Sequence, residues 1–164
     1  MAVDTSVIGR PTARFRVVVE RGPVTNFATA VTDKSPVYRE PAAAAVAGFK
    51  GIPAPPTFPF AARNWGAHPE LQADLEPVES DPVGEVLGAL LANGGLILHG
   101  EQSFEYQRPI VVGDVLRGEG RLVDLYEKES KGRTMTFLVV ETAWTDDTTG
   151  ELVLTERMNL IHRS

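Results

Sequence analysis

Long strands in the last third of the chain place the strongest limit on its fold. From Leu98 onward, apolar and polar residues alternate in segments separated by turn-forming residues, without helical periodicity. In residues 103–108 the alternation places Phe104 and Tyr106 on one face of a strand. Three more strands are expected at residues 115–126, 134–145 and 152–161, the last two joined by a hairpin at residues 146–150. The pattern predicts an antiparallel meander.

Two further features belong to this predicted sheet. Residues 14–20, near the start of the chain, form another candidate strand. Gly118 and Gly120 lie inside the strand expected at residues 115–126. Glycines inside a strand indicate a bulge or the close approach of another backbone.

Helices are expected before the run of strands. Residues 57–65 are apolar on nearly all sides, which is typical of a helix enclosed by a sheet. Residues 83–91 place apolar side chains at helical spacing behind the capping pair Asp81-Pro82. Shorter helices are expected at residues 23–31 and 41–47, and a loop at residues 66–80. An apolar helix followed by long antiparallel strands predicts an α+β domain in which a strongly curved sheet wraps a central helix, the arrangement of the hot-dog fold.

Composition and charge exclude several classes of function. The 164 residues include no cysteine and carry a formal charge of −6 without a basic cluster, so we expect neither thiol chemistry nor a nucleic-acid partner. The longest charge-free stretch, residues 86–100, is shorter than the about 20 apolar residues of a membrane span. The start of the chain has no secretion signal, so we expect a cytoplasmic protein consisting of one domain over residues 1–164. No metal-ligand spacing and no phosphate-binding glycine loop is present, so neither a metal nor a cofactor is expected.

Three motifs, in order along the chain, carry a resemblance to a known family. They read Asp33-Lys-Ser-Pro-Val-Tyr38, then Gly48-Phe-Lys-Gly-Ile-Pro-Ala-Pro-Pro-Thr-Phe58, then Phe104-Glu-Tyr-Gln-Arg-Pro-Ile-Val-Val-Gly-Asp114. The sequence resembles the MaoC-like (R)-specific enoyl-thioester hydratases and dehydratases, whose first two motifs read Asp-x-Asn-Pro-x-His and Gly-x-x-Gly-x-x-Ala-His-Gly-Met. Within that family it is most similar to the N-terminal FAS1-like dehydratase type and to the accessory subunit of the mycobacterial hydroxyacyl-carrier-protein dehydratase.

The resemblance implies a reaction that adds water to a 2-enoyl thioester or removes it. In the family an Asp and a His flank one water, and backbone N–H groups at the start of the central helix polarise the thioester carbonyl. Asp33 stands at the position of the Asp, whereas Tyr38 stands at that of the His. Pro55 replaces the second motif's His, and Pro56 falls where a glycine would supply its N–H, which proline lacks. The motif of this chain is therefore incomplete.

Asp33, Tyr38 and His99 are the candidate catalytic residues, and each has a local alternative. Asp33 precedes Ser35-Pro36 and suits a turn, and Tyr38 suits a packing role. His99 lies in a His-Gly-Glu-Gln stretch that resembles one found in many N-terminal FAS1-like domains, and either reaches a dimer cleft or is a structural histidine. The helix at residues 83–91 either covers one end of the sheet or lines a groove for an acyl tail. The candidate substrate-binding residues are Pro56, Thr57, Phe58 and Phe60.

The leading hypothesis is an accessory hot-dog subunit that holds an acyl-CoA or acyl-carrier-protein thioester. A partner hot-dog would supply the catalytic Asp and His, and the unpaired edge strand of a lone hot-dog favours association. The partner chain would form a hetero-oligomer, or a second copy would form a homodimer. The alternatives are a self-sufficient homodimeric hydratase that uses Asp33 or His99, a thioesterase, and a non-enzymatic acyl-thioester-binding module. The thioesterase lacks support because residues 57–65 contain no carboxylate.

Overall fold

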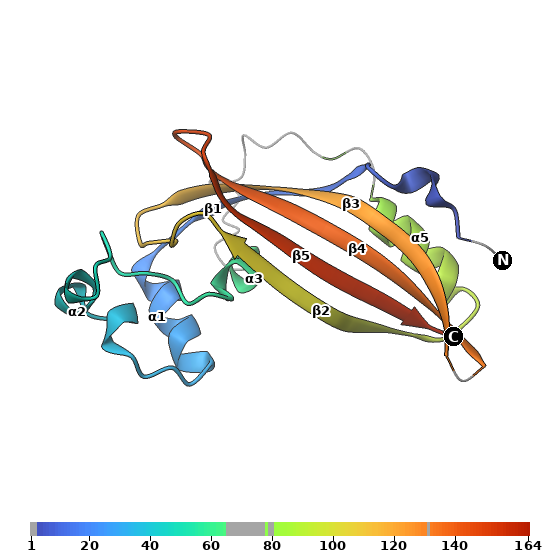
Figure 1. Cartoon of the computed structure of the whole chain (residues 1–164), viewed down its shortest axis with the longest axis horizontal. Helices are drawn as coiled ribbons and strands as arrows, with labels where there is room; N and C mark the ends of the chain where they lie inside the picture. Colours follow the sequence, from blue (N-terminus) through green and yellow to red (C-terminus); the bar gives the residue numbers. More distant parts are fainter. Residues whose placement is uncertain (1–2, 65–77, 79–80, 131) are drawn as a thin grey trace.

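Five antiparallel strands form one curved sheet with helices at its ends and on one face (Figure 1). The structure is a computed structural model that describes residues 3–64, 78, 81–130 and 132–164. The strand order across the sheet is β1-β3-β4-β5-β2. The strands are β1 (Pro11–Val18), β2 (Leu96–Tyr106), β3 (Val115–Ser130), β4 (Arg133–Asp146) and β5 (Leu152–Arg163). All five expected strands are confirmed, with ends that shift by a few residues.

The order of the strands differs from the simple meander that the sequence predicted. Strands β3, β4 and β5 do follow one another as neighbours, but β2 pairs with β5 and not with β3. Strand β1 takes the place beside β3. The meander prediction was wrong here because the alternation within a strand shows which of its faces is buried but not which strand lies beside it. Strands β1 and β2 are consequently the two edges of the sheet.

The helices lie in three places around this sheet (Figure 1). Helices α1 (Arg21–Ala30) and α2 (Pro41–Val46), with the short 3-10 turn η2 (Pro36–Tyr38), form a lobe at one end. Helix α5 (Pro82–Leu91) lies at the opposite end, near a second 3-10 turn, η1 (Thr5–Val7). Helix α3 (Phe58–Ala62) lies between them. None of the described helices has the length and apolar character needed to cross a membrane.

Helix α3 corrects the expectation of a longer central helix over residues 57–65. It has only five residues, although its buried position is confirmed, since Phe58, Pro59 and Ala62 are buried. Arg63 caps its C-terminal end. Trp65, the last residue of the expected helix, and nearly all of the loop expected at residues 66–80 fall outside the described residues.

Two apolar clusters form the core. The larger cluster contains Trp144 and Leu154 of the sheet together with Phe58 of α3 and Val24 of α1. The smaller contains Leu122, Leu125 and Leu138 of the sheet, and α5 packs against it with four residues of the expected stripe, Val83, Val86, Leu87 and Leu90. The fifth, Leu91, is 42% exposed, so the expectation was wrong there. Helix α5 therefore covers one end of the sheet.

The glycines of β3 lie where neighbouring groups pack closely, and one of them lies opposite an irregularity in the sheet. A Cβ atom at Gly118 would lie 3.0 Å from two ring carbons of Trp144, and one at Gly120 would lie 2.4 Å from Thr12 Oγ1. The β1–β3 pairing is irregular between Pro11 and Arg14, opposite Gly120, where the backbone oxygen of Ala13 would lie 3.3 Å from the added Cβ. Both the bulge and the close backbone approach are therefore confirmed at Gly120, whereas the atoms nearest to a Cβ at Gly118 belong to side chains.

Candidate functional site

A pocket of about 310 Å³ lies where the helical lobe meets the end of β2. Its walls come from all three sequence motifs, although the third begins 46 residues after the end of the second. The lining residues are Tyr38, Phe49, Pro53, Ala54, Pro56, Tyr106, Gln107, Arg108, Pro109 and Ile110. A concave, mostly apolar site with a few polar groups is typical of a binding site for a small organic ligand. We therefore take this pocket as the candidate site.

Backbone hydrogen bonds join the second motif to the third beneath the pocket. The N–H of Ala54 donates to the carbonyl of Ile110, with N and O 2.8 Å apart. The N–H of Val112 donates to the carbonyl of Ile52, also at 2.8 Å. Pro53, between these two bonds, forms an isolated bridge with Val111. The two motifs thus form one small, continuous wall.

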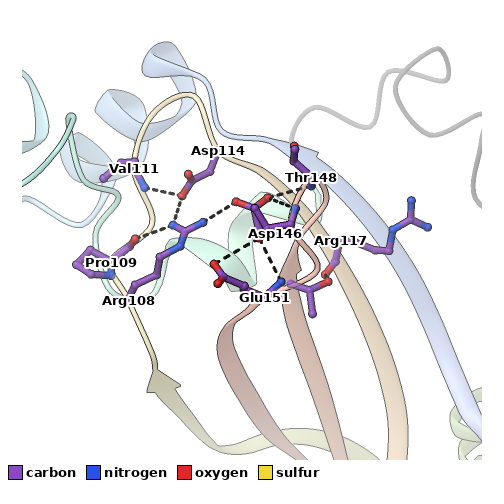
Figure 2. Close-up of polar contacts among 10 residues, drawn as sticks. Arg108, Pro109, Val111, Asp114, Arg117, Asp146, Thr148 and Glu151 are labelled. Carbon is purple, nitrogen blue, oxygen red and sulfur yellow. Dashed lines mark hydrogen bonds and ion pairs between the residues drawn. The ribbon is translucent and has the colours of Figure 1, made fainter.

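An arginine fixes the loop of the third motif to the turn between β4 and β5 (Figure 2). The Arg108 guanidinium donates to Asp114 Oδ2 at 2.6 Å and to Asp146 Oδ2 at 2.9 Å. Asp114 Oδ2 also accepts from the backbone N–H of Val111 at 3.0 Å. Gly113 has a φ of 102°, which favours glycine at this turn. The Gly-Asp end of the motif therefore shapes the loop that lines the pocket.

Tyr106 links the third motif to the start of α3. Its hydroxyl donates to the backbone carbonyl of Pro56, with the two oxygens 2.7 Å apart. Burial raises the pKa of Tyr106 above its usual range, and the negative charge of Glu156 raises it further. The phenol therefore stays protonated near neutral pH and acts as a hydrogen-bond donor. Phe104 and Tyr106 pack against the same core cluster, which agrees with the prediction that they share one face of the strand.

Asp33 and Tyr38 lie close together, but only Tyr38 is among the described residues that line the pocket. Asp33 Oδ1 accepts from the backbone N–H of Ser35 at 2.8 Å, which is the turn-forming role expected from the sequence. The Arg39 guanidinium fixes the same turn by donating to the carbonyl of Asp33 at 2.7 Å. Burial, and then the charge of Asp33, raises the pKa of the Tyr38 phenol. The Tyr38 phenol therefore stays protonated near neutral pH even more fully than a free tyrosine, so it offers no base there. A catalytic role for either residue stays a prediction.

The start of α3 offers few backbone donors. Pro55, Pro56 and Pro59 have no N–H, and the N–H of Phe58 donates to the carbonyl of Pro55 at 2.9 Å. At Pro56 it is the carbonyl that is engaged, by Tyr106. The segment therefore does not offer, at Pro56, the amide that a thioester oxyanion would need.

The other predicted site residues lie away from the pocket. Thr57 is exposed, and Phe58 is 2% exposed in the core, where its ring meets that of Phe27 edge to face at 5.7 Å. Phe60 is half-buried, and its ring lies 5.3 Å from that of His99, which is exposed on the edge strand β2. The structure thus brings Tyr38 and Pro56 together in the pocket and places the remaining candidates elsewhere. Their substrate-binding and catalytic roles stay predictions.

A buried glutamate is the polar feature that sequence reasoning missed. Glu156 on β5 is 1% exposed, and its carboxylate accepts from Gln102 Nε2 at 2.6 Å and from Trp144 Nε1 at 3.0 Å. It also forms an ion pair with Arg63. The signal was present in the sequence, because Glu156 follows Leu154 at the strand spacing of two and must face the core if Leu154 does.

A second, larger pocket of about 670 Å³ lies between α5 and the far ends of β3, β4 and β5. Val86, Ala89 and Leu90 of α5 form part of its apolar wall, so this helix both covers the sheet and lines a pocket. The charged residues among the described lining groups are acidic: Asp4, Glu85 and Glu127. Along β5, His162 of this pocket lies eight residues from Leu154, which pairs with Tyr106 of the first pocket. At about 3.3 Å per residue, the two pockets are roughly 26 Å apart and form separate sites.

Comparison with known proteins identifies the class of protein that this fold and site define. A family model described as "FAS1-like, dehydratase domain region" matches residues 6–156, and the chain belongs to this family. Among sequences, a UPF0336 protein of Thermobifida fusca (strain YX) is 34% identical over 145 residues, which cover 88% of this chain and 83% of the relative.

Two solved structures from Mycobacterium tuberculosis have the same fold. The ChsH1-ChsH2 complex matches with a TM-score of 0.74 and 22% identity, over 92% of this chain and 83% of the matched chain. The HadBC (3R-hydroxyacyl-ACP dehydratase) complex matches with a TM-score of 0.67 and 22% identity, over 97% and 99% of the two chains. The predicted α+β hot-dog fold and the resemblance to MaoC-like dehydratases are both confirmed.

Proposed function

We propose that this chain is an accessory hot-dog subunit of an (R)-specific enoyl-thioester hydratase or 3-hydroxyacyl-thioester dehydratase, and that it holds the substrate while a partner hot-dog supplies the catalytic Asp and His. The observation that carries the proposal is the state of the chain's own motif. A phenol of raised pKa stands in place of the imidazole, and Pro56 presents a carbonyl where the reaction needs an N–H. A chain with this motif binds a thioester more readily than it transforms one.

The pocket's chemistry supports a thioester ligand. Its walls are mainly aromatic and proline residues, and Tyr38 is one of them. Such a lining suits the apolar part of an acyl thioester, and a phenol that remains protonated can donate to a carbonyl. The HadBC complex, which shares the fold, is described as acting on a 3R-hydroxyacyl-ACP. We therefore propose an acyl-CoA or acyl-carrier-protein thioester as the ligand.

The edge strand β2 supports a partner subunit. Among the residues that the structure describes, it pairs with β5 alone, and Leu96, Ile97 and Leu98 at its start are 39%, 38% and 41% exposed. Consecutive exposed apolar residues on an unpaired edge favour association with another chain. Both solved structures compared above are described as complexes. A hetero-oligomer with a catalytic hot-dog is the proposed state, and a homodimer is the alternative.

Enoyl-thioester hydration in vitro tests the proposal. The purified chain is mixed with a trans-2-enoyl-CoA, alone and with each hot-dog protein of the same genome that has an intact Asp-x-Asn-Pro-x-His motif. Loss of absorbance from the conjugated thioester measures turnover. We expect no turnover by the chain alone. The mixture should turn over the substrate faster than the partner alone, and Asp33→Asn in this chain should leave the rate of the mixture unchanged.

Two variants distinguish the alternatives. Turnover by the isolated chain that Asp33→Asn or His99→Gln abolishes would establish a self-sufficient hydratase and end the accessory proposal. Tight binding of the thioester, with no activity in any mixture, would instead identify a non-enzymatic binding module.

A further inference from the structure

The buried carboxylate of Glu156 joins helix α3 to the sheet. Arg63, the C-terminal cap of α3, has a side chain that is 14% exposed and forms an ion pair with Glu156 Oε1. Gln102 of β2 donates to the same oxygen, and Trp144 of β4 donates to Oε2. A single carboxylate on β5 therefore contacts the helix and both neighbouring strands.

Two aromatic rings lie beside the Arg63 guanidinium. Its central carbon lies 4.9 Å from the ring centroid of Phe60 and 5.3 Å from that of Phe15 on β1. The buried Nε of Arg63 has no hydrogen-bond partner within the part of the chain that the structure describes. The guanidinium is thus fixed in position, with one donor unsatisfied.

Stability alone does not account for this pair. Burying two charges carries a desolvation penalty that their attraction often only offsets, and an unsatisfied buried donor adds to it. Apolar side chains of similar volume are commonly as stable in such a place. An ion pair with fixed hydrogen bonds defines one relative orientation of the two groups that it joins, which apolar contacts do not, because they are non-directional.

Helix α3 needs a directional anchor. A helix of five residues is too short to be stable by its own hydrogen bonds, and its buried side chains Phe58 and Ala62 can slide against an apolar surface. The other polar anchor lies just before the helix, where Tyr106 of β2 donates to the carbonyl of Pro56. Pro56 lines the candidate pocket, so the position of α3 sets the shape of one pocket wall.

We propose that Arg63 and Glu156 form a positioning pair that fixes α3 on the sheet and so sets the pocket's affinity for its ligand. The part of this inference that names an acyl thioester rests on the proposed function. The part that concerns the helix does not, because it follows from the contacts of the pair alone.

The test replaces both charges and measures helix mobility and binding separately. The double variant Arg63→Met, Glu156→Leu removes the pair without leaving a lone buried charge. We expect it to unfold at a lower temperature than the wild type, because Trp144 Nε1 and Gln102 Nε2 lose their acceptor. The backbone amides of residues 57, 58 and 60–62 should exchange hydrogen about tenfold faster or more, beyond any change in the amides of β4 and β5. We expect the affinity for octanoyl-CoA and octanoyl carrier protein, measured by calorimetry, to fall by about tenfold.

An exposed ion pair on the same two strands as Trp144 and Glu156 is the matched control. Arg157 of β5 and Glu141 of β4 form a pair with side chains 59% and 31% exposed. The double variant Arg157→Met, Glu141→Leu should leave both the exchange of α3 and the affinity unchanged. Wild-type exchange and affinity in the Arg63→Met, Glu156→Leu variant would overturn the proposal.

A milder variant covers the case in which the double variant does not fold. Glu156→Asp keeps the charge but withdraws the carboxylate by one methylene, so it should speed the exchange of α3 while the protein remains folded. Unchanged exchange in Glu156→Asp would also overturn the positioning role. Wild-type protein that binds neither octanoyl probe would overturn the proposed function, while the exchange rates would still decide the role of the pair.

Discussion

The packing of Gly118 against Trp144 predicts that adding one methyl group at this position lowers the stability of the protein. Gly118→Ala places a Cβ atom 3.0 Å from Cε3 and Cζ3 of Trp144 and 3.2 Å from Cδ2 of Phe15. These distances are shorter than ordinary carbon–carbon contacts of about 3.5–4.0 Å, so the rings must move. Trp144 has little freedom to do so, because it is fully buried and its Nε1 donates to Glu156.

The expected loss of stability is that of an overpacked core. Adding a methyl group to a well-packed interior typically costs about 1–3 kcal/mol. For a chain of this size, each kcal/mol lowers the melting temperature by about 2–4 °C, so we expect a fall of roughly 2–12 °C. Because Trp144 would move away from Glu156, we also expect its fluorescence spectrum to change.

Gly88→Ala is the matched control. Gly88 lies in helix α5, where an added Cβ would meet nothing within 4 Å, and glycine within a helix is less stable than alanine by about 0.5–1 kcal/mol. In thermal and urea unfolding, Gly118→Ala should therefore be less stable than the wild type and Gly88→Ala more stable. A Gly118→Ala protein as stable as the wild type would refute the reasoning, since it would mean that the two rings are not held where the contacts place them.

Three further predictions concern polar groups. Asp81→Ala removes the side chain that accepts a backbone hydrogen bond at the start of α5, so unfolding should become easier by about 1 kcal/mol, whereas Asp81→Ser should retain most of the stability. Glu156→Gln leaves the buried charge of Arg63 without its partner and should destabilise by about 3–5 kcal/mol in urea titrations; a loss below about 1 kcal/mol would contradict the buried ion pair. The Arg16 guanidinium, with a second arginine, holds the pKa of Asp147 below its usual range, so this carboxylate stabilises the fold above about pH 4 and the contribution is lost as pH falls through the lowered pKa. The free energy of unfolding is measured from about pH 2 to about pH 6, a range around the pKa of a free Asp. It should fall less steeply with falling pH in Asp147→Asn than in the wild type, and an unchanged slope would contradict this assignment.

Local sequence patterns predicted the elements that depend on nearby residues. The stripe of α5, its Asp81 cap and the alternation of β2 all follow from contacts within a few residues or from one buried face, and the structure has them. The turn at Asp33 was foreseeable for the same reason, because its hydrogen bond to Ser35 spans two residues. The five-residue length of α3 was not foreseeable from its apolar composition.

The candidate site was foreseeable only in part. The three motifs named Tyr38, Pro56 and the segment that contains Tyr106, and these residues do meet in one pocket. Sequence reasoning could not separate Pro56 from Phe58 and Phe60, because all three are apolar residues in or beside the same helix. Which of these side chains faces the core and which faces the pocket depends on how α3 sits on the sheet.

The amino-acid sequence by itself determined the family, the succession of strands and helices, and the loss of the imidazole and the amide from the motif. These are properties of residue identity and of spacing along the chain. Only the tertiary structure decided that β2 pairs with β5, that Glu156 meets Arg63, and that three distant motifs line one pocket. Such pairings join residues far apart in sequence, and they are selected by the packing of the whole core rather than by any local preference.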